Sequence, residues 1–281
     1  MRFPLSLFAI GLILGNSSHA RAQAAANAPL PDPHVLLQRA IANEKKLADE
    51  QERYECRVTS ESIETDKNGS VKKKTVEVKD QFYVNGMEIE HTLTKDGKEL
   101  SPDEMRKEDK RVMKETIKDS DKDYAAKQAS KQDRQTEDFL SAMMLQNGRR
   151  ERQNGRSVLF YNIVANPHFD AKNLNQKFAS VMQGTIEMDE QTGEMIDLNI
   201  KSVQDLKIAG GLLANLHKGF WVHVHQQPQA DGVWLTDLAE GSGDARAMLF
   251  VHPYFRFKET TGDCHLYTAT AQQVGKATVV K

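Results

Sequence analysis

Apolar residues recur at helical spacing in one segment near the N-terminus. Asp32-Pro33 supplies an N-cap followed by proline at the first helical position, and the helical pattern continues to about Gln51. The pattern predicts one amphipathic helix, because its apolar residues fall on a single face. Those apolar residues are Val35, Leu36, Ala40, Ile41 and Leu47.

From Tyr54 onward the pattern changes to the alternation that is typical of strands. The segments 54–65, 75–84 and 87–93 are separated by Asn68-Gly69 and Asn85-Gly86, which are signals for tight hairpin turns. Strands joined by such short turns pair antiparallel with their sequence neighbours. The sequence therefore predicts an antiparallel meander.

A helical insertion over about 102–146 interrupts the strands. Ser101-Pro102-Asp103-Glu104 forms a capping-box pattern that predicts a helix starting at Pro102. The stretch 118–134 is almost entirely polar, so we expect either a solvated helix or a mobile break there. A second short helix ending at Asn147-Gly148 is predicted from an apolar cluster of Phe139, Leu140, Ala142, Met143, Met144 and Leu145.

Strand patterns then run nearly to the C-terminus, which makes roughly ten strands and three helices in all. This arrangement predicts an α+β fold with one curved antiparallel sheet, a half-barrel, and helices packed on its concave face. The later strand segments are 149–153, 156–165, 185–188, 195–203, 220–225, 233–238, 247–257 and 264–271.

The first 22 residues have the pattern of a signal peptide. Arg2 supplies a basic start, residues 3–15 are apolar, and Ala20-Arg21-Ala22 offers a small-x-small cleavage site, with Ala22-Gln23-Ala24 as a second register. A membrane anchor needs about 18 or more apolar residues, and this run is shorter. We expect an exported, periplasmic protein.

The predicted domain organisation follows from these patterns. It consists of a signal peptide at 1–22, a linker at 23–33, one β-rich domain at 34–271 and a C-terminal tail at 272–281.

Composition excludes two classes of protein. The 281 residues include 38 Lys+Arg and 40 Asp+Glu, for a net charge of −2, and 39% are hydrophobic. Such a chain is too apolar to be wholly disordered and has no basic excess for nucleic acid. We expect no nucleic-acid partner and no transmembrane segment in the mature chain.

Enzyme motifs are missing from the sequence. It contains no Gly-x-Ser-x-Gly elbow, no His-Glu-x-x-His and no Walker loop. Asp237 and Glu240 lie beside Gly241-Ser242-Gly243, which we interpret as a loop, where paired acids are more often solvated than catalytic. We therefore predict a protein without enzymatic activity and without a cofactor.

The two cysteines have two open interpretations. Cys56 lies in the first strand-like segment and Cys264 in the last, so export to an oxidising compartment favours a disulfide, while two unpaired thiols are the alternative. Such a disulfide would close a loop of ~200 residues, which the chain-entropy model values at roughly 4 to 5 kcal/mol.

The pair His223 and His225 also has two interpretations. Alternation places both imidazoles on one face of a strand, about 7 Å apart, where His217 or His252 could complete a metal site. The alternative is a solvent-facing row with Trp221 on the same face. We favour the row, because no third ligand is placed by the sequence.

Two segments carry a resemblance to a known family. Gly184 to Ile196 runs from glycine through an alternating strand to Asp189, a Thr192-Gly193 turn and a second strand, and Asp231 to Leu235 has the form of a later strand entry. With the order of elements, these segments resemble the LolA/LolB/RseB-like superfamily of periplasmic lipoprotein-sorting and lipid-binding proteins.

That resemblance implies a half-barrel whose concave side, covered by helices, accepts acyl chains or a partner peptide. The sequence departs from the family in two ways. It has no lipobox of an outer-membrane-anchored receptor, and its charged segment 118–134 is unlike a compact lid.

Two apolar segments are candidates to line such a cavity. The Met-rich cluster at 139–144 could adapt to a variable ligand, or it could simply be core, which is the commoner fate of an apolar helix face. The apolar stretch 208–214 with Gly210-Gly211 could gate a cavity or be a buried connection.

The predicted function is binding of a lipid or lipoprotein acyl chain between sheet and helices, as in transport to the outer membrane. The alternative is an envelope protein–protein interaction or sensor module without lipid cargo. The candidate ligand-binding residues are Phe139, Leu140, Met143, Met144, Leu212, Leu213 and Trp221.

Overall fold

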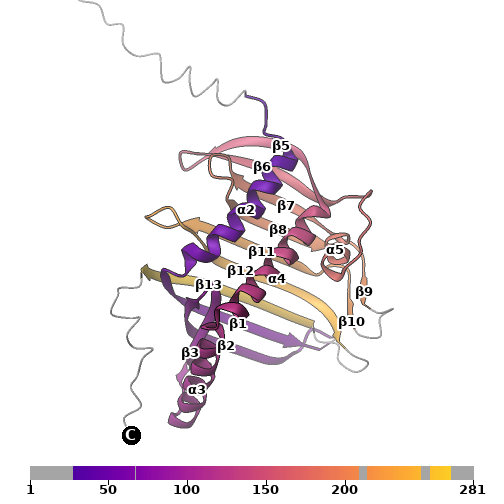
Figure 1. Ribbon diagram of the computed structural model, residues 1–281. Helices are drawn as coiled ribbons and strands as arrows, with labels where there is room; N and C mark the ends of the chain where they lie inside the picture. Colours follow the sequence, from indigo (N-terminus) through magenta and orange to yellow (C-terminus); the bar gives the residue numbers. More distant parts are fainter. Residues whose placement is uncertain (1–27, 67, 209–213, 248–253, 267–281) are drawn as a thin grey trace, which may run out of the picture.

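The computed structural model describes residues 28–66, 68–208, 214–247 and 254–266 (Figure 1). The predicted signal peptide, most of the predicted linker, the predicted C-terminal tail and the candidate residues Leu212 and Leu213 lie outside these described residues.

The predicted N-terminal helix is confirmed as α2 (Pro33–Gln51), and the Asp32 side chain caps it by accepting a hydrogen bond from the His34 amide. One face of α2 is buried against the sheet, although Val35 is 51% exposed and Leu37 occupies the buried position instead. The buried face consists of Leu36, Leu37, Ala40, Ile41 and Leu47.

In the described part of the chain, eleven strands form one continuous antiparallel sheet that does not close, in the order β4-β3-β2-β1-β13-β12-β11-β8-β7-β6-β5. Two short strands, β9 and β10, pair with each other, and β10 pairs with β12. The strands are β1 (Tyr54–Thr65), β2 (Val71–Val84), β3 (Met87–Lys95), β4 (Lys98–Glu99), β5 (Met143–Gln153), β6 (Arg156–Ala165), β7 (Met182–Asp189), β8 (Met195–Ser202), β9 (Leu206–Ile208), β10 (Ala214–Leu216), β11 (Trp221–Pro228), β12 (Trp234–Ala247) and β13 (Tyr254–Leu266).

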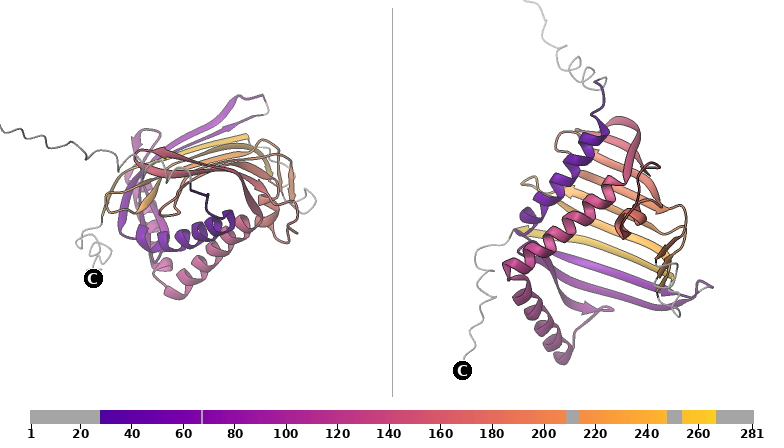
Figure 2. Two further views of the ribbon diagram at one scale, coloured as in Figure 1. Left: turned by 90° about the horizontal axis from the view of Figure 1, so that it is seen from above. Right: turned by 45° about the vertical axis from the view of Figure 1, so that its right-hand side comes forward.

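The sheet arches over the helices, and Figure 2 shows α2 and α4 lying across the concave side of the arch. The other helices are α3 (Pro102–Asp119), α4 (Lys122–Ser141) and the short α5 (Leu174–Ala179). The predicted α+β half-barrel with helices on its concave face is thereby confirmed.

The predicted meander of the strands 54–65, 75–84 and 87–93 is confirmed as β1 to β3, and its hairpin turns explain why. Asn85 and Gly86 adopt φ values of 49° and 75°, the left-handed conformation that a tight hairpin turn requires and that Asn and Gly tolerate. The meander then joins the C-terminal strands, because β1 pairs antiparallel with β13 over its whole length.

The capping box at Ser101 and Glu104 is confirmed, with the Ser101 hydroxyl accepting from the Glu104 amide. The polar segment 118–134 is helical apart from a break at Ser120-Asp121, where the Asp121 side chain caps α4. We expected either a solvated helix or a mobile break in this segment, and most of the segment is helical.

The predicted helix over Phe139 to Leu145 is wrong beyond Ser141. Met143 begins β5, because Met143 and Leu145 alternate at strand spacing and pair with Ala165 and Ile163 of β6. Sheet pairing here overrides the local helical preference. Asn147-Gly148 is a register irregularity inside β5 rather than a helix end.

The interpretation of Gly241-Ser242-Gly243 as a loop is also wrong, since all three residues lie inside β12. A Cβ on Gly241 would lie 2.6 Å from the Trp221 carbonyl oxygen and 2.7 Å from the Phe257 ring, so only glycine fits. The break predicted between the strands 247–257 and 264–271 is wrong, because β13 runs without interruption from Tyr254 to Leu266. Residues 248–253 and 267–271 of these two predicted strands lie outside the described residues.

The main core lies between α2, the end of α4 and strands β5 to β8, with Leu36, Leu159 and Ile163 fully buried. A smaller cluster near the C-terminal end of α2 consists of Leu47, Tyr54, Cys56, Val233 and Leu235. The concave face is therefore packed with apolar side chains at its β5–β8 end.

Candidate ligand cavity

The concave face is hollow at its β1–β3 end. Two adjoining cavities of ≈ 210 Å³ and ≈ 460 Å³ lie there, and both are lined by Gln51, Tyr83, Glu88 and Thr236. We call them the inner and the outer cavity. The larger volume falls in the range of small-molecule sites, roughly 300 to 1,000 Å³.

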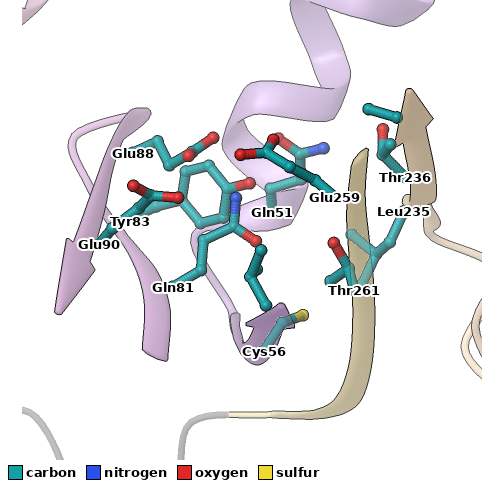
Figure 3. Close-up of a pocket in the computed structure, with 12 residues that line it drawn as sticks. Gln51, Cys56, Gln81, Tyr83, Glu88, Glu90, Leu235, Thr236, Glu259 and Thr261 are labelled. Atoms are coloured by element: carbon teal, nitrogen blue, oxygen red, sulfur yellow. The ribbon is translucent and has the colours of Figure 1, made fainter. Parts of the chain in front are cut away.

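The inner cavity has an apolar floor and polar walls. Its floor consists of Cys56, Val58, Leu235 and Ala239 from the central strands. Figure 3 shows Gln51 from α2, Tyr83 from β2 and Glu259 from β13 converging on the hollow.

Register explains why the wall of the inner cavity is polar. The Asn85-Gly86 turn pairs Tyr83 with Glu88 and Gln81 with Glu90, so all four side chains share one face of the hairpin. β1 then pairs Cys56 with Gln81, which puts that face on the side of the sheet facing α2.

The inner cavity gathers negative charge. Glu88, Glu90 and Glu259 line it, and Lys79 Nζ lies 2.7 Å from Glu90 Oε2 beside them. The Ser60 hydroxyl donates to Glu259 over 3.0 Å. Burial raises the pKa of the Glu88 carboxyl, and the nearby Glu90 charge adds to the rise, because both disfavour a further negative charge.

The outer cavity lies between α2, α4 and the Asn85-Gly86 turn. Glu44, Lys45 and Asp49 reach it from α2, and Asp133 reaches it from α4. Lys45 Nζ lies 3.8 Å from Asp133 Oδ2. Burial raises the pKa of the Glu44 carboxyl. The two helices that cover the sheet thus add further carboxylates to those of the strands.

Gln226 of β11 is the most buried polar side chain of the outer cavity. It is 5% exposed, and its Oε1 atom accepts no hydrogen bond from any described residue. Since nearly all buried polar groups in folded proteins are paired, an unpaired acceptor on a cavity wall is a candidate contact for a ligand.

Of the five candidate residues that the structure describes, three meet at the main core and two lie on the opposite face of the sheet. Phe139 and Leu140 pack against the main core, and Met143 is part of it at 3% exposure. Met144 follows the inward-facing Met143 in β5, so strand alternation turns it to the opposite face.

Trp221 likewise precedes Val222, which packs against the core, and so it lies on the convex face. None of these five described residues lines the inner or the outer cavity. Their role in ligand binding stays a prediction.

The cavity residues escaped the sequence analysis because Gln81, Glu88 and Glu90 look like solvent-facing strand residues. The hairpin turn alone could have grouped them on one face. Their burial depends on α2 and α4, which cross the strands in three dimensions.

His223 and His225 share the convex face with Trp221, as predicted, but carboxylates surround them. His223 Nε2 lies 2.6 Å from Asp197 Oδ2 and its Nδ1 3.3 Å from Glu240 Oε1, while His225 Nδ1 contacts Asp237 Oδ1 at 2.5 Å. Asp237 and Glu240 are therefore partners of histidines on a strand.

Burial lowers the pKa of His223, but the hydrogen bonds to Asp197 and Glu240 outweigh it and raise the pKa above its ordinary value. Among the described residues, no group of three His, Cys, Asp or Glu side chains is arranged to hold a metal ion. His223 and His225 on the convex face are thus arranged as histidine–carboxylate pairs.

No protein-family model and no curated protein matches the chain. Among solved structures, a Vibrio parahaemolyticus domain provisionally named an outer membrane lipoprotein-sorting protein is 12% identical, with a TM-score of 0.31, over 85% of this chain and 95% of that one. A DUF1329 family protein from Desulfovibrio piger is 8% identical, with a TM-score of 0.29, over 88% of this chain and 98% of the other. At such TM-scores neither similarity bears on ligand or partner.

Within the described ranges, no helix is both long enough and apolar enough to cross a bilayer.

Proposed function

We propose that this protein is an exported, non-enzymatic carrier that binds an amphiphilic ligand, a lipid or a lipoprotein, between its sheet and helices α2 and α4. The observation that carries the proposal is the pair of adjoining cavities under these helices, ≈ 210 Å³ and ≈ 460 Å³ in volume. A concave site of this size is the usual place for a ligand.

The lining supports an amphiphile rather than a wholly apolar ligand. Val58, Leu235 and Ala239 offer apolar surface on the sheet, and Ile41 and Leu47 offer more from α2. The remaining walls are mostly polar, with carboxylates, amides, hydroxyls and one lysine, and these groups require hydrogen-bonding partners when water is displaced. A ligand with a polar end and an apolar part satisfies both kinds of wall.

Binding without catalysis fits the described lining best. It holds no histidine, and its cysteine, Cys56, is in a disulfide. Nucleophilic catalysis needs a nucleophile with an adjacent general base, and the described lining offers neither a histidine base nor a free thiol for that pair.

Native mass spectrometry of the mature protein, purified from a bacterial envelope, tests the proposal. We expect a co-purifying mass in the lipid range. Thr236 lines both cavities, so Thr236→Trp should fill the space and remove that mass.

Thr260→Trp, at an exposed strand position, is the matched control and should keep the mass. A protein that stays unliganded after incubation with envelope lipids would overturn the carrier function.

A second candidate function, an envelope protein–protein interaction module, is favoured by helix α3. This helix has no buried residue, and Met105, Met113 and Ile117 are 47%, 61% and 65% exposed. Met113 and Ile117 are four residues apart and Met105 is two turns earlier, so they share one helix face. If Thr236→Trp changes nothing while Met113→Ser abolishes capture of an envelope protein, the interaction module replaces the carrier.

A further inference from the structure

We propose that the cavity recognises a protonated amine on its ligand. This inference rests on the proposed function, since it names the polar group of the ligand that the carrier would hold. Two independent observations support it: the charges that line the cavities, and one buried acceptor without a partner.

The charges of the described lining are strongly unbalanced. Six carboxylates line the two cavities. One lysine, Lys45, lines the outer cavity, and a second, Lys79, lies beside the inner one. The six carboxylates are Glu44, Asp49, Glu88, Glu90, Asp133 and Glu259. The combined site is therefore net negative.

Both lysines already contact carboxylates. Lys79 Nζ lies 2.7 Å from Glu90 and 3.9 Å from Glu77, and Lys45 Nζ lies 3.8 Å from Asp133. Against the larger effect of burial, which raises the pKa of the Glu88 carboxyl, the neutral side chain of Gln81 beside it lowers that pKa. A neutral donor satisfies the geometry of a carboxylate but does not balance its charge.

Glu259 is in the same situation, because its donor is the neutral Ser60 hydroxyl. Glu88 and Glu259 both line the inner cavity, so a cation entering it would meet two carboxylates that lie beside uncharged polar side chains. Attraction between opposite charges is strong at such a partly dehydrated position.

The second observation is Gln226. Gln226 is only 5% exposed and lines the outer cavity. Its Oε1 atom has no hydrogen-bond partner among the described residues. An ammonium group has three donors and no acceptor, so it matches a wall made of acceptors. A phosphate or carboxylate group offers acceptors and negative charge, which this lining opposes.

A metal ion fits less well than an amine. No group of three potential metal ligands among the described residues has a metal-binding arrangement. An amine needs no fixed coordination geometry, because each N–H can meet a different acceptor.

The amine could belong to a lipid or lipoprotein, or to a free polyamine. Three probes distinguish these sources by isothermal titration calorimetry at pH 7: dodecylamine, 1-dodecanol and spermidine. The first two share an apolar chain and differ in charge, and the third carries amines without the chain.

We expect dodecylamine to bind at least about tenfold more tightly than 1-dodecanol, which is the scale of one charge-assisted hydrogen bond. Glu88→Gln and Gln226→Met should each weaken dodecylamine binding about fivefold or more and leave 1-dodecanol unchanged.

Glu187→Gln is the matched control. Burial raises the pKa of Glu187 as it does that of Glu88, but Glu187 pairs with Asp197 in the sheet and lines neither cavity. This variant should bind all three probes like the parent protein.

Equal affinities for dodecylamine and 1-dodecanol would overturn the amine inference and leave the carrier function standing. Binding of spermidine without either dodecyl compound would support the amine inference and overturn the lipid cargo. A folded protein that binds none of the three would overturn both. If Gln226→Met does not fold, the comparison of probes on the parent protein and on Glu88→Gln still decides.

Discussion

Cys56 on β1 and Cys264 on β13 are 208 positions apart in the sequence, yet a disulfide joins them and their Cα atoms lie 4.1 Å apart. The bond ties the N-terminal meander to the C-terminal strand at the middle of the sheet. Cys56 also forms part of the inner cavity floor. The disulfide therefore holds together the two halves of the sheet that meet at the cavity.

Removing this disulfide should lower the stability of the whole domain. The chain-entropy model gives about 5 kcal/mol for a loop of this length. We expect the double variant Cys56→Ala, Cys264→Ala to unfold at clearly lower urea concentration than the parent. Reductant should shift the parent to the same midpoint and leave the variant unchanged. Equal midpoints for parent and variant under oxidising conditions would contradict the structural role.

Gly184 should tolerate no side chain. A Cβ at this position in β7 would lie 1.8 Å from the Asn199 carbonyl oxygen and 2.8 Å from Ile200 Cα, both backbone atoms of β8. Gly184→Ala should cost at least ~2 kcal/mol, because the strands must separate locally.

Gly262 in β13 is the matched control for this experiment. A Cβ there meets nothing within 4 Å, so Gly262→Ala should change the free energy of unfolding by less than about 0.5 kcal/mol. A Gly184→Ala variant that unfolds at the same urea concentration as Gly262→Ala would disprove the close approach of β7 and β8.

Local signals explain what the sequence could predict. Asp32-Pro33, Ser101 with Glu104 and the Asn-Gly turns act over a few residues, so α2, the start of α3 and the hairpins follow from them. The order of neighbouring strands follows in turn from the short connections.

Long-range packing explains what the sequence could not predict. Met143 joins β5 because β6 offers it a partner, and Gly241 continues β12 because it pairs with Val222 of β11 and Phe257 of β13. Glu88 lines a cavity because helices cover its strand. In each case the deciding contact lies far along the chain, where local pattern carries no information.

Glu194 should make the stability depend on pH in the acid range. Burial, and the neighbouring Glu44 and Glu50 charges, raise its pKa from 4.5 to about 6. The native state therefore holds a proton that the unfolded state has released, and stability falls as pH rises from about 4.5 to 6.

Glu194→Gln should abolish that fall and raise stability above pH 6 by about 1 kcal/mol, after allowance for solvent screening. Thermal melts at several pH values measure this. The exposed Glu137→Gln is the control and should keep the parent profile. If the stability of Glu194→Gln falls with pH as that of the parent does, a different titrating group causes the fall.

His223 should make the stability depend on pH at higher pH values than Glu194 does. Its pKa is raised above 6.5 by Asp197 and Glu240 against the opposing effect of burial, so the protonated form stabilises the native state. This stability is fully present below pH 6.5 and is lost as pH rises through the raised pKa. In His223→Gln the melting temperature should lose its decline in this window, whereas the exposed His168→Gln should retain it.

Hydrogen exchange of the protein with and without an envelope lipid extract, read by mass spectrometry, shows directly whether a ligand lies between sheet and helices. We expect slower exchange where the cavity walls lie, in 44–51 of α2 and 81–88 around the β2–β3 turn. Unchanged exchange in both segments, with protection confined to α3, would contradict a ligand held between sheet and helices.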